Sequence, residues 1–203
     1  VGISSIGDTT VVTDKWMLGT RNSFIVGISA TFLATALGTV AALGLSRPHM
    51  PFKGTIMAIL ISPMIVPLII TAAGMFFFYS KVGLTHSYLG LILAHTALGT
   101  PFVVITVTAT LTGFDTNLIR ASQSLGANTM RTFFKVIMPL ILPGVISGAL
   151  FAFITSFDEV VVVMFVGSVE QITIPKQMWA GLRQETSPVI LCMATCLVFL
   201  SIA

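Results

Sequence analysis

Charged side chains are scarce in this sequence. Asp, Glu, Lys and Arg make up 8% of its 203 residues, whereas soluble proteins carry about 25%. Hydrophobic residues make up 55%, and the mean hydropathy is +1.02. The ten Lys and Arg are never adjacent, and a net charge of +3 is too small for a nucleic-acid surface. The composition excludes nucleic acid as a partner and predicts a protein embedded in a lipid bilayer.

Motifs for catalysis and cofactor binding are also lacking. The sequence contains no GxxxxGK[ST] phosphate loop, no GxGxxG and no HExxH pair, and its three histidines are scattered. The two cysteines, Cys192 and Cys196, are four residues apart in an apolar run, so we interpret them as packing residues. We therefore predict no catalytic site, no metal and no cofactor, and no disulfide can be inferred. The chain is not expected to be an enzyme or to hydrolyse ATP itself.

Apolar runs dominate what is present, and they predict an all-α, polytopic transmembrane helical bundle. Four of them exceed the roughly 20 residues that cross a bilayer, and the fifth is shorter: Asn22–Leu45, Thr55–Tyr79, Tyr88–Leu111, Leu140–Val166 and Val189–Ala203. Pro63 and Pro67 predict a kink in the second run. Val1–Arg21 and Gly167–Ser187 are interpreted as polar segments outside the spans. We predict one domain, residues 1–203, truncated at both ends.

The longest polar interruption, Thr112–Pro143, has a helical pattern of its own. Asp115 can cap a short helix that Gly126 would end, and Asn128 can cap a second one. In each helix one face is mostly apolar by its spacing: Leu118, Ala121, Ser122 and Leu125 in the first, Met130, Phe133, Phe134 and Ile137 in the second. Pro139 is expected where the chain turns into the next span. Two amphipathic helices meeting at a glycine predict a surface that another protein grips.

The segment RASQSLGANTMRTFFKVIMP resembles the EAA loop of the membrane subunits of binding-protein-dependent ABC importers. Six residues stand at positions of the family pattern: Ala121, Gly126, Ala127, Phe133, Val136 and Pro139. Arg120 stands where the family usually has Glu, and Ser122 where it often has Ala. The resemblance implies that residues 112–139 form a cytoplasmic coupling loop, whose ATPase-coupling residues are Arg120, Ala121, Ser122, Leu125, Gly126, Ala127, Phe133 and Pro139.

The segments SFDEVVVVMFVG, TIPKQMW and SPVILCMATCLVFL, with NSFIVGISATFLATALGTVAALGLSR, resemble the spermidine/putrescine permeases of that family. The resemblance implies a six-span subunit, with one span missing before Val1, in a bacterial plasma (inner) membrane. It also implies partners: separate ABC ATPase subunits, a second permease subunit (identical or homologous) and a periplasmic solute-binding protein. The implied solute is a polyamine.

Asp158 and Glu159 are adjacent carboxylates within the fourth apolar run. Carboxylates inside a membrane span are costly unless paired or hydrated, and they default to a functional role. Because adjacent helical residues point about 100° apart, at most one of them need face a pathway. Polyamines are cations, so we predict a substrate path formed by Asp158, Glu159, Phe157, Tyr79 and Trp179, the aromatic rings adding cation–π contacts. The alternative is ion pairing at the outer surface with Lys81, Lys176 or Arg183.

Other interpretations stay open. A secondary transporter or channel would use the two carboxylates as an ion relay without an ATPase, and a membrane enzyme would need clustered reactive groups. His95 lies inside the third run. We interpret it as a packing or hydrogen-bonded residue in preference to a proton relay. Lys and Arg divide five against five between the two sides of the membrane, so charge alone does not set the topology.

Overall fold

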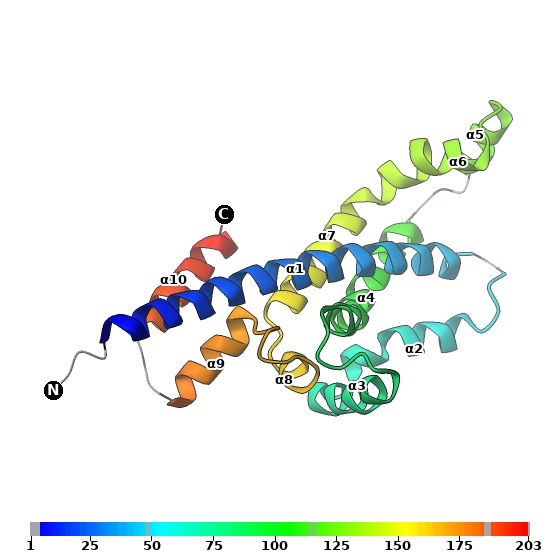
Figure 1. Cartoon of the computed structure of the whole chain (residues 1–203). Helices are drawn as coiled ribbons and strands as arrows, with labels where there is room; N and C mark the ends of the chain where they lie inside the picture. Colours follow the sequence, from blue (N-terminus) through cyan, green and yellow to red (C-terminus); the bar gives the residue numbers. More distant parts are fainter. Residues whose placement is uncertain (1–4, 48, 114, 116, 185–187, 203) are drawn as a thin grey trace.

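The computed structural model describes the chain except residues 1–4, 48, 114, 116, 185–187 and 203, and the described part consists of helices and their connections (Figure 1). In chain order the helices are α1 (Ser5–Leu45), α2 (Lys53–Ile65), α3 (Leu68–Val82), α4 (Tyr88–Thr112), α5 (Asn117–Ser124), α6 (Thr129–Thr132), the π-helical turn η1 (Phe133–Ile137), α7 (Met138–Phe157), α8 (Val161–Val166), α9 (Ile174–Gln184) and α10 (Pro188–Ile202). The predicted all-α class is confirmed.

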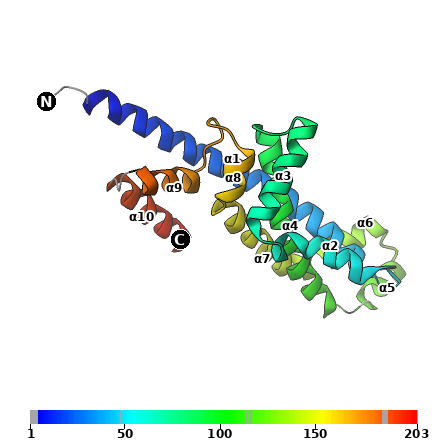
Figure 2. The ribbon, with the colours of Figure 1, turned by 90° about the horizontal axis from the view of Figure 1, so that it is seen from below.

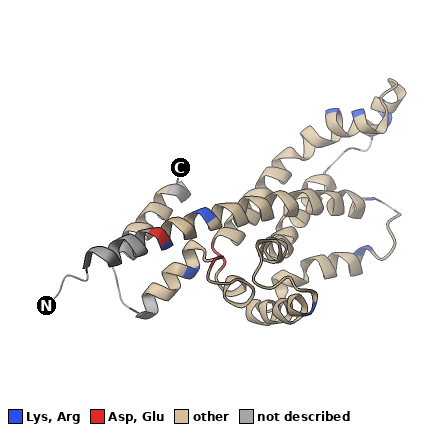
Figure 3. Ribbon diagram, viewed as in Figure 1, with Lys and Arg blue, Asp and Glu red and all other residues tan. Residues whose placement is uncertain are grey.

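Three long helices, α1, α4 and α7, pack pairwise and form the centre of the molecule. Each belongs to a stretch long and apolar enough to span a membrane, and α4, α7 and the part of α1 after Arg21 carry no charged residue (Figure 3). Small residues let these helices approach closely. A Cβ added at Gly148 of α7 would lie 2.8 Å from the Cα of Val103 on α4. The first and third predicted spans are therefore confirmed as helices.

The α1 helix begins earlier than the sequence suggested. Val1–Arg21 was interpreted as a polar segment outside the span, but the helix is continuous from Ser5 to Leu45. Trp16, only 9% exposed, packs with Ile174 in a small core between α1, α9 and α10. This tertiary packing favours helix in a segment whose own pattern gave no amphipathic signal. Figure 2 shows α9 and α10 beside this half of α1, at the end opposite α5 and α6.

The second predicted span is broken into two helices rather than kinked. Helices α2 and α3 are bent by 104° relative to each other. Val66 is extended (φ −72°, ψ 136°) because the residue before a proline is disfavoured in the helical region, and Pro67 has no N–H to continue the ladder. The Pro67 carbonyl instead accepts from Ile70 and Thr71 at 2.9 and 3.2 Å, which starts α3.

The fourth predicted span, Leu140–Val166, is not continuous either. α7 ends at Phe157, residues 158–160 interrupt the helix, and α8 contains only six residues. The side chain of Glu159 explains the restart, because its Oε1 accepts the N–H of Val162 at 2.8 Å and so caps α8. The irregular backbone here lines a cavity, one of the settings in which a membrane protein tolerates it.

The segment after α8 contains a helix that the sequence interpretation placed in a polar loop. Residues 167–173 form a connection, and α9 follows from Ile174 with Pro175 in its first turn. Asn22 of α1 holds the connection, since its Nδ2 donates to the carbonyls of Glu170 and Ile172 at 2.7 and 2.9 Å. The fifth apolar run is α10, of 15 residues.

Candidate functional site

The predicted coupling loop has the local structure that its caps and glycine suggested. Asp115 accepts the N–H of Asn117 at 2.9 Å at the start of α5. At the other end Gly126 has φ 83°, a left-handed conformation that glycine adopts at little cost. The Gly126 N–H donates to the Gln123 carbonyl at 2.9 Å and the Ala127 N–H to the Ser122 carbonyl at 3.0 Å. These two bonds form a Schellman motif, which ends the helix.

The second helix of the loop continues directly into the membrane. Asn128 caps α6 by accepting the N–H of Arg131 at 2.9 Å. The prediction of a turn at Pro139 is wrong, because residues 129–157 form one run through η1 into α7. Pro139 lacks the N–H that would bond one turn back, and the π-helical turn just before it, closed by the Met138 N–H on the Phe133 carbonyl, accommodates that loss. The second helix of the loop is therefore continuous with α7.

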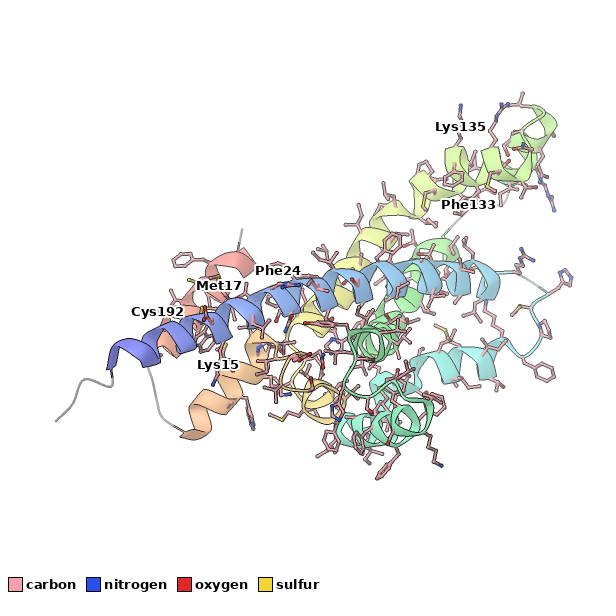
Figure 4. The ribbon with its side chains drawn as sticks, in the orientation of Figure 1. Lys15, Met17, Phe24, Phe133, Lys135 and Cys192 are labelled. Carbon is pink, nitrogen blue, oxygen red and sulfur yellow. The ribbon has the colours of Figure 1, made fainter. Side chains whose placement is uncertain are left out.

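The two sides of the loop differ. Ser122 Oγ lies 2.9 Å from Thr132 Oγ1, which ties α5 to α6, and Ile119 and Gln123 line a cavity of about 360 Å³ beneath α5. Other apolar side chains are exposed on the loop: Leu118, Ala121, Leu125, Met130 and Phe134. Leu125 is 88% exposed. Figure 4 shows Phe133, which is half-buried, and Lys135 at this projecting end.

The predicted coupling residues thus fall into three groups. Ser122 and Phe133 contact the rest of the chain, Gly126 and Ala127 form the turn, and Arg120, Ala121, Leu125 and Pro139 are exposed. Ser122 was predicted on the same face as Leu125, but its hydroxyl turns inward to Thr132. The sequence left open whether the apolar face packs on the permease or on a partner. In this chain that face is uncovered.

The two adjacent carboxylates have different environments. Asp158 is exposed and lines a cavity of about 470 Å³ that reaches from the end of α7 to Leu68, the first residue of α3. Glu159 is 7% exposed, and its carboxylate is engaged in capping α8. The cavity therefore lies where the two broken helix pairs meet, and Asp158 is the exposed carboxylate on its wall.

The alternative of an ion pair with Lys176 does not hold. The Lys176 ammonium donates to the carbonyls of Val163 and Ser168 at 3.2 and 3.4 Å. Lys81 is exposed at the end of α3, and the side chain of Arg183 lies outside the described part of the chain.

The predicted aromatic members of the substrate path do not line this cavity. Phe157 stacks on Phe153 and meets Phe24 of α1 edge-on, with ring centroids 5.3 and 5.4 Å apart. Tyr79 is 8% exposed within the core between α3, α4 and α8. Trp179 lies half-exposed on α9. The structure brings Asp158 and Glu159 together on the cavity wall and places the three rings elsewhere.

Two buried polar residues near these elements lie outside the predicted substrate path. His95 of α4 is 1% exposed, and its Nδ1 lies 2.7 Å from Ser156 Oγ on α7, which confirms the prediction of a hydrogen-bonded histidine. Asn22 is fully buried and also accepts from the Tyr88 hydroxyl at 2.8 Å. A polar residue inside an apolar run (His95) and one at the start of a run (Asn22) were the available signals, but their partners are distant in sequence.

Long apolar helices around two helix breaks, with a two-helix loop projecting from one end, define a multi-pass membrane protein. Residues 34–203 match the model of the binding-protein-dependent transport system inner membrane component family, and the chain belongs to that family. It is the transmembrane permease subunit of an ABC importer. This membership decides against the secondary transporter, the channel and the membrane enzyme.

Individual relatives support the same family assignment. The chain is 32% identical to the spermidine/putrescine transport system permease protein PotC of Haemophilus influenzae, over 90% of this chain and 71% of that protein. It is 29% identical to the putrescine transport system permease protein PotI of Escherichia coli K12, over 90% and 67%. The methionine ABC transporter MetNI, in an inward-facing conformation, has the same fold, with a TM-score of 0.74 at 24% identity, covering 94% of this chain and 90% of that one.

Proposed function

We propose that this chain, with a second permease subunit, forms the path of a polyamine into a bacterial cell across the inner membrane. A separate ABC ATPase supplies the energy, and a periplasmic solute-binding protein delivers the solute. The names of the relatives, spermidine/putrescine and putrescine permeases, support the solute class. The family description, a binding-protein-dependent system, supports the partners.

The observation that carries the proposal is the exposed carboxylate of Asp158 beside the cavity between α7, α8 and α3. Polyamines carry ammonium groups, and a carboxylate is the side chain that pairs with them. Glu159 is already engaged at the N-terminus of α8, so we assign the contact with solute to Asp158 and a structural role to Glu159. A carboxylate left exposed within an apolar bundle is stabilised when a cation occupies the cavity.

We further propose that the ATPase grips the exposed apolar side of α5 on the cytoplasmic side. Movement of α5 reaches α6 through the Ser122–Thr132 hydrogen bond and the Gly126 turn. It then reaches α7 through the continuous helix that ends beside Asp158. The coupling loop and the solute cavity thus lie at opposite ends of one helical run.

The test is ATP-dependent uptake of labelled putrescine and spermidine by the assembled transporter in proteoliposomes, with an amino acid and an oxyanion as competing solute classes. Asp158→Asn keeps the size of the side chain and removes its charge. Glu170→Gln makes the same chemical change at an exposed carboxylate in the 167–173 connection and is the matched control.

We expect polyamine uptake that requires ATP, falls at least about tenfold in Asp158→Asn, as for the loss of a charged contact, and is unchanged in Glu170→Gln. ATP-driven entry of a different solute alone would refute the polyamine assignment. Equal polyamine uptake by the parent and Asp158→Asn would refute the role of the carboxylate.

A further inference from the structure

The last turn of α7 is held on two sides before the chain reaches Asp158. On the side of α1, Phe157 packs edge-on against Phe24. On the side of α4, Ser156, 5% exposed, hydrogen-bonds to the imidazole of His95. Ser156 lies two residues before Asp158. A contact that fixes the position of Ser156 therefore also fixes the position of the last turn of α7.

This hydrogen bond joins two helices, unlike most hydroxyl bonds in the bundle. Thr96, the neighbour of His95 on α4, donates at 2.7 Å to the Ile92 carbonyl of its own helix, and Thr100 does the same with Thr96. Such bonds do not restrain one helix against another. The Ser156 hydroxyl, by contrast, is 2.7 Å from a ring that belongs to α4, 61 residues earlier in the chain. In an apolar interior a bond of this kind has no water to replace it when it breaks.

The ring itself is oriented by that bond. His95 is 1% exposed, and among the described residues its Nε2 has no hydrogen-bond partner. Nδ1 therefore provides the one polar restraint on the ring. The ring is buried, and Ala94 and Leu98 of the same helix belong to a hydrophobic core. A histidine fixed in this way can hold Ser156 at a defined distance from α4.

We propose that His95 is a positioning residue for solute transfer. Through Ser156 it fixes the last turn of α7, so that the chain leaves the helix with Asp158 on the wall of the cavity. His95 does not touch the solute. The inference rests on the proposed role of Asp158, because it assigns to His95 the task of presenting that carboxylate.

The experiment measures the concentration dependence of ATP-driven polyamine uptake by the assembled transporter, and compares variants at each end of the hydrogen bond. His95→Leu and Ser156→Ala each remove one partner. Loss of a buried hydrogen bond that orients Asp158 should raise KM about three- to tenfold and leave the maximal rate within about twofold. The double variant should be no worse than the poorer single one, because both remove the same bond.

Conservative and control variants separate positioning from general packing. Asn places a polar atom where Nδ1 lies, whereas Gln carries it one bond further, so His95→Asn should keep a KM near the parent value and His95→Gln should not. Thr96→Val removes a buried hydroxyl from the same helix without a bond between helices, and it should leave KM unchanged. If His95→Leu does not assemble, the comparison of the Asn and Gln variants gives the answer on its own.

Asp158→Asn is measured beside them. A raised KM in Asp158→Asn with a parent KM in both Ser156→Ala and His95→Gln would overturn this inference and leave the proposed function intact. A parent KM in Asp158→Asn would overturn the proposed role of Asp158 instead. Additive effects in the double variant would also contradict the inference, because they would mean that His95 and Ser156 act separately.

Discussion

The two ends of the helical run from Thr129 to Phe157 satisfy their polar groups in opposite ways. At the end near Phe157, side chains hold the irregular backbone. Asn22 donates to two carbonyls, Lys176 donates to two more, and Glu159 caps α8. At the α5–α6 end the loop bonds mainly to itself through its caps and its glycine turn. It exposes Leu125 and Phe134 instead of burying them.

This difference indicates where each end finds its stability. At the Phe157 end, side chains of this chain hold the irregular backbone, and Asp158 is the carboxylate there that remains exposed beside a cavity. The α5–α6 end has apolar surface without cover in this chain, which is the usual mark of a protein–protein contact. Substitutions at the first end should therefore change the stability of the subunit, and those at the second should change its response to a partner.

The largest effect on stability is expected for Asn22→Ala. The substitution removes the donor from two carbonyls and the acceptor from the Tyr88 hydroxyl, at a position with no exposed surface. Three groups lose a partner, and each buried group left unpaired costs about 1–3 kcal/mol, so we expect a loss of at least about 3 kcal/mol. The measurement is thermal unfolding of the purified transporter in nanodiscs.

Asn128→Ala is the matched substitution at the other end. Asn128 is exposed and makes a single capping bond, so the expected loss is about 1 kcal/mol. If the two alanine variants melted at the same temperature, the proposed contrast between the two ends would be wrong.

Gly126→Val should have a smaller effect on stability than Asn22→Ala and a large effect on coupling. A Cβ at Gly126 would meet nothing within 4 Å, so the cost comes from φ 83° alone, about 1–3 kcal/mol for a β-branched residue. The turn would relax and move α5 relative to α6. We expect ATP hydrolysis to continue while uptake per ATP falls several-fold.

Gly113→Val is the control for this prediction, because Gly113 also faces open space but has φ −88°. Normal uptake per ATP in Gly126→Val, or an equal loss in Gly113→Val, would contradict a specific role for the turn.

Local signals in the sequence were enough for the coupling loop but not for the solute cavity. Asp115, Gly126 and Asn128 act on neighbours a few residues away, so their caps and turn could be predicted from spacing. The break at Asp158 depends on the Glu159 side chain, which accepts the N–H of Val162 and so caps α8. It lies within an apolar run whose composition favours a continuous helix. The role of Asn22 depends on partners about 150 residues later, at Glu170 and Ile172, and no local pattern reports such a contact.

The smallest effect on the subunit itself is expected for Leu125→Ser. Leu125 is 88% exposed, so its replacement removes almost no packing, and the unfolding temperature should stay within about 1 °C of the parent, a change below about 0.5 kcal/mol. The same substitution removes an apolar contact from the surface that we assign to the ATPase. It should weaken ATPase binding to the permease about tenfold, measured by titrating the ATPase onto permease in nanodiscs. Val169→Ser, at a position 79% exposed beyond the Phe157 end, is the matched control and should leave that affinity unchanged. Equal weakening by both variants would mean that the exposed apolar side of α5 is not the surface that the ATPase grips.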